Sequence, residues 1–475
     1  MKARRILPFA AAVAALCVGD AALAQARRQR SPTVIFSPTG NYQNPGARAF
    51  ALGGAFVGLA DDASASELNP AGLSQLRRPE LGVEFRRLET TIPVRYPAAT
   101  SVGDFECVSF AAAGGPCEKD GRSSENSLAF VSLVVPGGSN LTFAGYRHEI
   151  DRERFSIVRP AYTFATQQVP GTIQQLDRRL DRTGLAIAWA PLQSLSVGVT
   201  AHVNTLNQSF SLSEYSTPSI SDGPLGGAPS VLWSLLDQHV DQSKVGATAG
   251  LLWRPIRPLA VGLSYSLRVR YQETGVRQPC AAYRDDGTAV CGFSSGDPDP
   301  GNPYTRVETS PPFTLPARAA GGVSVRPAGW LTLVAETDFV TYSDNNVEIP
   351  RVVPGAAGHV AAITFDRLVA NDVWEIHAGA EGAFPFAGSG LVAVRVGYWR
   401  DPDHSYRYDR CKTSTGEGCT ADAFFSLTNP PRGDLDHFTG GVGIAWKWGQ
   451  VDFGYDWIQQ EKRGSFAVSV VLRAK

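Results

Sequence analysis

The sequence predicts an all-β protein: a fourteen-stranded antiparallel transmembrane β-barrel with a small N-terminal luminal hatch of short helices (residues 46–73). Three observations predict this fold. Polar and apolar residues alternate in segments of about ten residues, tight turns alternate with long loops, and an export signal opens the chain. A tilted strand of about ten residues crosses a bilayer, with one face toward lipid and one toward the lumen.

The first element is a signal peptide over residues 1–24. Basic residues open the chain, an apolar run follows, and Ala22-Leu23-Ala24 matches an A-x-A cleavage site. The apolar run is too short to stay in a bilayer as a helix. We expect an exported mature chain that begins near Gln25.

Charge and hydropathy narrow the class further. The formal net charge of −1 argues against a nucleic-acid-binding protein. No mature segment reaches eighteen consecutive apolar residues, so no transmembrane helix is predicted. After the signal we expect an N-terminal arm and the hatch over 25–79, and then the barrel over 80–475.

The cysteines of the mature chain fall into three local pairs. Exported chains meet an oxidising compartment, so disulfides are the default interpretation. A zinc site is disfavoured because no C-x-x-C occurs and no histidine cluster accompanies the pairs. We expect no metal and no cofactor, and disulfides that join Cys107 to Cys117, Cys280 to Cys291 and Cys411 to Cys419.

Period-two alternation defines the barrel strands. In 261–271 the apolar side chains from Val261 to Tyr271 share one face, whereas Arg268 and Arg270 share the other, predicted luminal face. The predicted strands are 80–88, 126–135, 140–149, 182–190, 194–207, 244–254, 258–271, 316–326, 329–341, 373–384, 390–400, 437–447, 450–460 and 464–474.

Tight turns join these strands at one rim and long loops join them at the other. This asymmetry is typical of outer-membrane barrels. Trp189 and Trp253 at the tight turns and Trp457 at the other rim suggest two aromatic girdles. We expect a monomeric, multi-pass barrel in the outer membrane of a Gram-negative bacterium, in contact with lipid and lipopolysaccharide. The alternative is a soluble array of β-sandwiches.

The hatch is the segment "GARAFALGGAFVGLADDASASELNPAGL" from Gly46 to Leu73. An even strand number places both chain ends in the periplasm, and small residues allow this segment to pack against the inner wall. Asp61 and Asp62 can cap a short helix over 63–67. The Asn69-Pro70 pair ends that helix, and Pro70 can start a second turn.

This segment resembles the N-terminal hatch of the FadL/TodX-type outer-membrane transporters of hydrophobic compounds, and Asn69-Pro70-Ala71 resembles their NPA motif. The resemblance implies passive, TonB-independent uptake of long-chain fatty acids or aromatic hydrocarbons. It also implies control by the hatch and a lateral exit at a kinked third strand. The matching hatch residues are Gly46, Arg48, Gly53, Gly54, Asp61, Asp62, Asn69, Pro70 and Ala71. The chain departs from the family in a basic arm before Gly46 and in a non-aromatic C-terminus.

Three further sets of residues are candidates for function. Gly145 lies in a predicted third strand without a coherent lipid face, so it marks either the lateral opening that the resemblance implies or an irregular strand. An outer-loop helix is predicted over 230–241 as a lid, through Leu232, Leu235 and Leu236; it either catches ligand or packs only on loops. Candidate partners of a ligand carboxylate, which otherwise pair with luminal acids, are Arg86, Arg268, Arg270, Arg395 and Lys447.

Other functions fit less well. A dinucleotide site at Gly53, Gly54 and Gly58 would need a βαβ unit, but β-hairpins follow. No catalytic motif such as G-x-S-x-G or H-E-x-x-H occurs, so an enzyme is not expected. Two alternatives to the hydrophobic channel stay open: a barrel of the same fold that anchors secretion partners, and a general aqueous porin.

Overall fold

The computed structural model describes most of the chain from residue 44 onward. The described residues are 44–96, 117–138, 140–159, 162–164, 167–169, 171–215, 232–283, 289–291, 307–309, 312–354, 360–386, 388, 390–413 and 433–474. The predicted signal peptide and the basic arm up to residue 43 lie outside them, as do Cys107 and Cys419.

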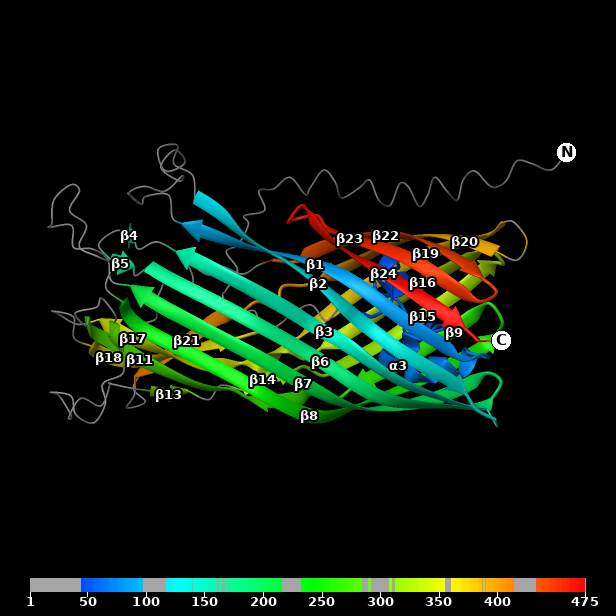
Figure 1. Cartoon of the computed structure of the whole chain (residues 1–475), viewed down its shortest axis with the longest axis horizontal. Coiled ribbons are helices and arrows are strands. Elements are labelled where there is room, and N and C mark those ends of the chain that lie inside the picture. Colours follow the sequence, from blue (N-terminus) through cyan, green and yellow to red (C-terminus); the bar gives the residue numbers. More distant parts are fainter. Residues whose placement is uncertain are drawn as a thin grey trace.

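Fourteen antiparallel strands form a closed barrel, as predicted (Figure 1). Each strand pairs with the next one around the ring, and the first pairs with the last from Glu80–Arg473 to Arg87–Phe466. The ring is β1 (Glu80–Tyr96), β2 (Cys117–Pro136), β3 (Leu141–Arg159), β6 (Gly171–Leu192), β7 (Leu195–Tyr215), β8 (Leu232–Ile256), β9 (Leu259–Ser266), β15 (Arg318–Ala328), β16 (Leu331–Val340), β19 (Val373–Phe386), β20 (Gly390–Asp401), β22 (Leu435–Trp446), β23 (Gly449–Ile458) and β24 (Arg463–Arg473).

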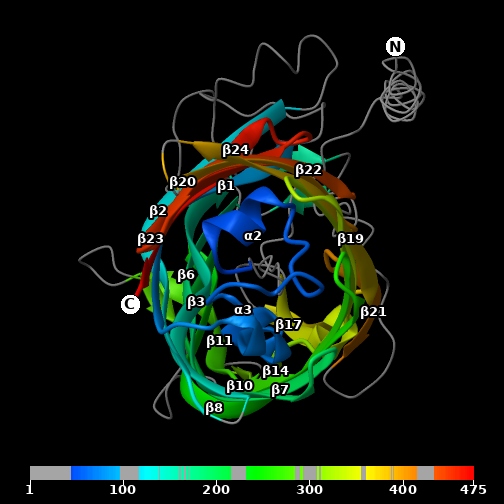
Figure 2. The same cartoon turned by 90° about the vertical axis from the view of Figure 1, so that its right-hand side faces the viewer.

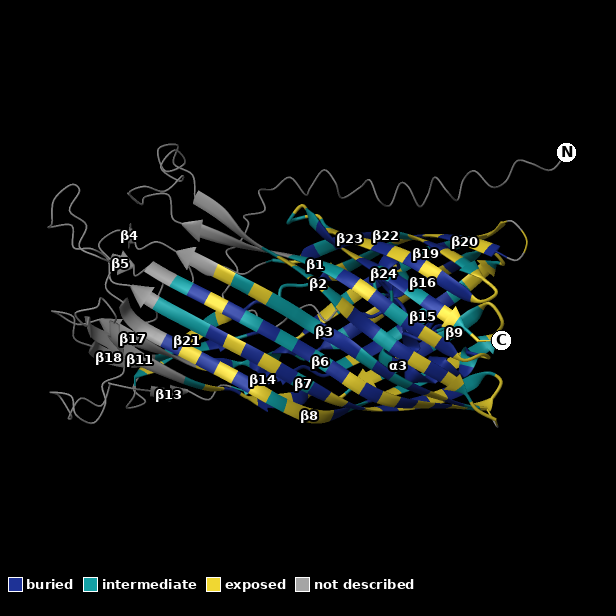
Figure 3. Cartoon of the chain, in the orientation of Figure 1, coloured by how far each residue is buried: buried dark blue, intermediate teal, exposed yellow. Residues whose placement is uncertain are grey.

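The two faces of the wall differ in polarity as the sequence predicts. Along β7, Val199 and Val203 are exposed on the outside, whereas Thr200, His202 and Asn204 are buried on the inside. The same alternation of buried and exposed residues runs along the neighbouring strands (Figure 3). An apolar outer band around a polar interior is the surface of an outer-membrane β-barrel, and it excludes the array of soluble sandwiches.

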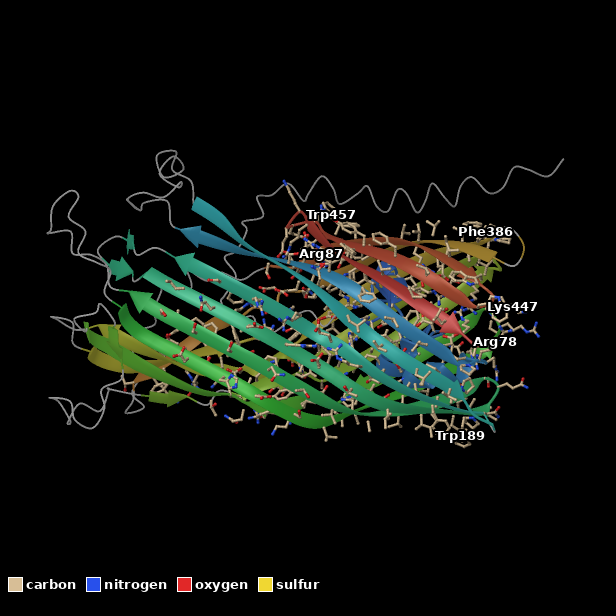
Figure 4. The ribbon with its side chains drawn as sticks, viewed as in Figure 1. Arg78, Arg87, Trp189, Phe386, Lys447 and Trp457 are labelled. Carbon is tan, nitrogen blue, oxygen red and sulfur yellow. The ribbon has the colours of Figure 1, made fainter. Side chains whose placement is uncertain are left out.

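Aromatic and basic side chains mark the two edges of the apolar band. Trp189, Phe386 and Lys447 lie at the end of the barrel that carries the tight turns, and Trp457 and Arg87 lie toward the other end (Figure 4). Rings at both edges fit the predicted girdles, because aromatic side chains favour the headgroup level. Within the described ranges, no helix combines the length and hydropathy needed to cross a membrane.

The hatch is inside the barrel, as predicted. Its short helices are α2 (Ala47–Ala51), α3 (Ala65–Leu68) and the 3₁₀ helix η1 (Pro70–Gln75), and they lie within the ring of strands (Figure 2). The predicted helix over 63–67 begins two residues later, at Ala65. Asp62 accepts a hydrogen bond from the amide of Ser64 at 2.9 Å, and Pro70 is the first residue of η1.

One side of the wall rises well above the other. Strands β3, β6, β7 and β8 each continue beyond the band (Figure 1). We call this the tall wall, and β11 (Thr274–Tyr283) extends it by pairing with β8. The remaining outer elements are β4 (Tyr162–Phe164), β5 (Gln167–Val169), β10 (Val269–Gln272), β12 (Ala289–Cys291), β13 (Val307–Thr309), β14 (Pro312–Leu315), η2 (Tyr342–Asn345), β17 (Val347–Pro354), β18 (Val360–Val369) and β21 (Arg407–Thr413).

The lid helix predicted over 230–241 is wrong, because Leu232, Leu235 and Leu236 belong to strand β8. Leu236 and Val240 are both buried on the inner face of the tall wall. A spacing of four residues places side chains on one face of a helix, but also on one face of a strand. Pairing of β8 with β7 along its length decided between the two.

The predicted disulfides remain a prediction with partial geometric support. Cys280 in β11 and Cys291 in β12 are direct partners across an antiparallel ladder. Proteolytic mapping of the unreduced protein should give peptides that join Cys280 to Cys291, Cys411 to Cys419 and Cys107 to Cys117. Each local bridge closes a loop of about ten residues and should contribute about 2–3 kcal/mol in the chain-entropy model. A peptide that joins cysteines of two different pairs would refute the scheme.

Candidate functional site

Part of the hatch packs against the barrel through its backbone. A β-carbon added at Gly262 in β9 would lie 2.1 Å from the carbonyl oxygen of Val57. One added at Gly322 in β15 would lie 2.8 Å from the amide nitrogen of Gly58. Only glycine allows such an approach, so the inner wall is shaped to receive the hatch main chain.

The Asn69-Pro70-Ala71 motif connects two hatch segments with the wall. The Asn69 amide donates to the carbonyl of Val57 at 2.8 Å and to the carbonyl of Leu251 in β8 at 3.1 Å. Its Oδ1 accepts from the amide of Ala71 at 3.2 Å. Asn69 is fully buried, so these bonds satisfy its polar atoms and fix the start of η1.

A chain of charges fastens the first hatch helix. Arg48 pairs with Asp61 of the hatch at 2.6 Å and with Glu381 of β19 at 2.8 Å. Glu381 also binds Arg395 of β20 at 2.6 Å, and Arg395 binds Asp452 of β23 at 2.8 Å. Both basic groups and both wall acids therefore have ion-pair partners inside the barrel.

Acidic wall residues also hold hatch backbone directly. Glu336 in β16 accepts hydrogen bonds from the amides of Phe56 and Val57, each at 2.7 Å. Glu84 in β1 accepts from the amide of Gly46, which has a positive φ of 95°. On the other side of the lumen, Glu67 of α3 pairs with Arg182 of β6 at 2.7 Å.

Above the hatch, apolar side chains line the inner face of the tall wall. Ile150, Leu180, Leu206 and Val240 come from four adjacent strands and pack against the paired strands β10 and β14. We call this group the upper cluster; its members from β10 and β14 are Val269, Tyr271, Phe313 and Leu315. A second buried group made of Leu176, Phe210 and Leu236 continues the apolar surface along the same wall.

Few charges lie next to the upper cluster. The Arg178 guanidinium lies 5.6 Å from the ring of Phe313 and pairs with Asp151 and Glu153 of β3 at 2.6 and 2.7 Å. Glu273, between β10 and β11, accepts a hydrogen bond from Gln208 at 2.9 Å. Burial raises the pKa of Glu273 to about 7, although Gln208 and Arg178 oppose the shift. The carboxyl is therefore largely neutral in mildly acidic surroundings.

Two predicted carboxylate partners face the lumen but are already engaged. Arg86 is buried, pairs with Glu84, and donates to the carbonyl of Asn44 at 2.9 Å. Arg395 is held by Glu381 and Asp452, as described above. For these two residues the structure shows the arrangement in which luminal charges pair with one another.

The luminal orientation predicted for Arg268, Arg270 and Lys447 is wrong. Strand β9 ends at Ser266 and β10 restarts at Val269, so the break reverses the alternation and turns Val269 inward. Arg268 is exposed and pairs with Asp344 at 2.8 Å, and Arg270 is exposed. Lys447 follows the end of β22 and lies outside the lumen at the tight-turn rim (Figure 4).

The break in the ladder predicted at Gly145 is also wrong. Gly145 pairs with Leu133 of β2 on one side and with Leu185 of β6 on the other. The β2–β3 ladder instead ends at the Phe130–His148 pair. Beyond it β2 continues with β1 and β3 with β6, so the two hairpins diverge (Figure 1). We call the stretch where β2 and β3 no longer pair with each other, before Phe130 in β2 and after His148 in β3, the seam.

Sequence reasoning missed the upper cluster and the seam. The wall segments above the band carry many polar residues on both faces, so their alternation is weak. The available signal was a single apolar residue repeated at the same height on neighbouring strands, such as Leu180 opposite Leu206 in the β6–β7 ladder. That signal appears only when the strand register is known.

Sequence comparisons give no match: no protein-family model and no curated protein matches the chain. Comparison with solved structures does find matches. A Pseudomonas aeruginosa FadL homologue has a TM-score of 0.57 at 14% identity, covering 93% of this chain and 99% of that chain. The Ralstonia pickettii toluene transporter TbuX has a TM-score of 0.51 at 15% identity, with 92% and 100% covered.

A third structure, the CymD monoaromatic hydrocarbon channel, has a TM-score of 0.50 at 15% identity, covering 92% of this chain and 98% of that chain. All three comparisons cover more than nine tenths of this chain. The chain therefore has the fold of the FadL-type outer-membrane barrels, with a sequence far removed from theirs.

Proposed function

We propose that the protein is a passive, TonB-independent channel for the uptake of hydrophobic small molecules across the outer membrane. The observation that carries this proposal is the sequence in which apolar side chains and then the hatch occupy the lumen from the outer side inward. Apolar side chains line the inner wall on the outer side, and a tightly bonded hatch fills the lumen below them. The fold is that of structures described as a FadL homologue, a toluene transporter and a monoaromatic hydrocarbon channel.

The packed hatch supports a hydrophobic channel over a general porin. Ala51, Leu52 and Phe56 of the hatch are completely buried, so the lumen at their level contains protein rather than a water column. Ions need a hydrated path, because transferring a bare charge into an apolar medium is very costly. An apolar molecule needs contact with apolar side chains; the upper cluster consists of such side chains, and because they are buried against β10 and β14 they would have to separate to admit cargo.

The charges favour uncharged cargo. A fatty acid carboxylate that enters a dry lumen needs a basic partner. The luminal candidates Arg86 and Arg395 are bound by Glu84 and by Glu381 and Asp452. An aromatic hydrocarbon requires no such partner, so we propose monoaromatic hydrocarbons as the preferred class and long-chain fatty acids as the second.

Uptake by whole cells tests the function. Cells that produce the protein should accumulate labelled toluene faster than cells without it, and labelled oleate less so. A small hydrophilic sugar should enter both cell types equally. Equal toluene and oleate rates with and without the protein would contradict the proposal and leave the secretion-anchor alternative. Faster sugar entry would indicate a porin.

We further propose that cargo leaves the lumen sideways through the seam. Ile150 belongs to the upper cluster and lies on β3 just beyond the last β2–β3 pair, so the apolar surface reaches the seam. A bridge of 3.8 Å between Glu125 of β2 and Arg152 of β3 crosses it. Lateral passage is physically favourable because each buried CH₂ contributes about 0.8 kcal/mol.

Cross-linking the seam should stop uptake. In Glu125→Cys/Arg152→Cys, a reducible thiol cross-linker should lower hydrocarbon uptake toward that of cells without the protein, and reduction should restore it. The matched control is Thr205→Cys/Ser243→Cys on the outer face of the paired β7–β8 ladder, where the hydroxyls are 2.9 Å apart. If the cross-linked seam variant transports as fast as the control, the seam is not the exit.

A further inference from the structure

We propose that Asp338, Glu375 and His377 form a binding site for a divalent cation of the zinc type, which fastens the hatch to the wall. Asp338 in β16 stands directly opposite Glu375 in the β16–β19 ladder. His377 follows Glu375 by two residues and shares its face of β19. The three side chains therefore converge on one luminal point.

The distances match a metal site better than a hydrogen-bonded cluster. The potential ligand atoms all lie within 4.8 Å of one another. His377 Nε2 is 3.4 Å from Asp338 Oδ2 and 3.6 Å from Glu375 Oε2. These separations exceed an ordinary hydrogen bond. Tetrahedral zinc with bonds of about 2.0–2.1 Å separates its ligand atoms by roughly 3.4 Å.

The site also contains polar atoms that protein does not satisfy. Asp338 is completely buried and its Oδ1 has no hydrogen-bond partner among the described residues. His377 is 5% exposed, and its Nε2 likewise lacks a hydrogen-bond partner there. Asp338 Oδ2, the oxygen 3.4 Å from His377 Nε2, accepts a hydrogen bond from Arg318 Nε at 2.9 Å, so a cation would share that oxygen with Arg318 or bind Oδ1. Oδ1 and Nε2 are buried atoms of ligand type without a hydrogen bond from the described part of the chain, and a bound cation would supply their partner.

Hydrogen bonding of the imidazole prepares it for metal binding. His377 Nδ1 lies 2.6 Å from the carbonyl oxygen of Gly53 and must donate to it, because a carbonyl only accepts. In the neutral ring, Nε2 then carries the lone pair. Metal-binding histidines commonly donate the other ring N–H to a backbone carbonyl in this way. Here the carbonyl belongs to the hatch, so a cation on Nε2 would stiffen the contact between hatch and wall.

The charges of the surroundings suit a dication. Glu336, Asp338 and Glu375 are three acidic side chains, and Arg318, which pairs with Asp338 and lies 3.4 Å from Glu336, is the basic one beside them. With a neutral imidazole at His377, the acidic side chains of this group outnumber its single guanidinium. Imidazole together with carboxylates selects zinc and similar metals over magnesium or calcium. No metal-binding motif is visible in the sequence, because the three proposed ligands come from two different strands.

Metal binding to the full-length untagged protein in detergent tests the site. After dialysis against Zn²⁺, elemental analysis should find one equivalent, and Co²⁺ should give the visible absorption of a tetrahedral complex. His377→Gln should weaken binding at least tenfold, as should Asp338→Asn. The matched control is His437→Gln, because His437 stacks on the opposite side of Trp399 from His377 and pairs with Asp456 at 2.9 Å.

Either of two results would overturn the site. One is absence of stoichiometric binding of Zn²⁺ and Co²⁺ by the folded protein, which would leave His377 as a charged imidazole between two carboxylates. The other is unchanged stoichiometry and affinity in both the His377→Gln and Asp338→Asn proteins. Barrel integrity is followed separately by heat-modifiable migration on gels, so a folding failure is distinguished from loss of the site.

Discussion

Deletion of residues 46–73 should convert a barrel with little steady ion conductance into an open pore in planar bilayers. The hatch fills the lumen with fully buried residues such as Ala51, Leu52 and Ala71. Its removal uncovers wall charges such as Glu336 and Glu381, which water and ions would then solvate. Barrels of sixteen to eighteen strands with an unplugged interior hold an aqueous channel, and fourteen strands approach that size.

Point substitutions test the same idea without a deletion. Gly322→Leu pushes a side chain into the amide of Gly58 and should displace the hatch, which raises conductance. Gly321→Leu is the matched control, because its β-carbon would meet only the lipid-facing side chain of Leu263 at 3.5 Å. High conductance of the unmodified protein, or equal currents from the two glycine variants, would show that the hatch does not close the lumen.

Most of the barrel could be predicted because its rules are local. A strand with one face in lipid and one in a wet lumen must alternate, so the sequence marks all fourteen strands and their tight turns. The hatch was recognisable for a similar reason, since small residues allow close packing against a wall. The hatch backbone can approach the wall closely at Gly262 and Gly322 because these wall residues also lack side chains.

The errors arose where tertiary pairing decides between local patterns. Leu232, Leu236 and Val240 recur every four residues, which fits a helix and a strand equally well, and pairing of β8 with β7 chose the strand. At Leu267 and Arg268 the chain leaves the barrel between β9 and β10. A change of this kind reverses every later side chain, so Arg270 was assigned to the wrong face.

The ion pairs of the lumen could be predicted only as a class. Sequence shows that acidic and basic residues face inward, but not which of them meet. Arg48 reaches Glu381, which is 333 positions later in the chain. The two meet because the hatch folds back into a ring that the last strands close. Residues at such separations become neighbours only when the register of every strand is fixed.

Substitution of Arg395 by alanine should destabilise the folded barrel by about 3–5 kcal/mol, because it leaves the buried Asp452 without its basic partner. The Arg395 side chain is only 2% exposed and lies between Glu381 and Asp452. After the change Asp452 keeps a hydrogen bond from Gln450 at 2.7 Å, and Glu381 keeps Arg48. Denaturant unfolding in detergent, followed by heat-modifiable migration, measures the loss.

Arg268→Ala is the matched control, since its side chain is 67% exposed and pairs with Asp344 at the surface. Exposed pairs contribute about 0–1 kcal/mol, so this variant should unfold almost as the parent does. The double variant Arg395→Ala/Asp452→Asn separates charge from packing. If an unpaired carboxylate causes the loss, neutralising Asp452 should recover part of it, because residues of one network are not additive. A loss in Arg395→Ala no larger than in Arg268→Ala would show that water reaches this part of the lumen and that the hatch does not seal it.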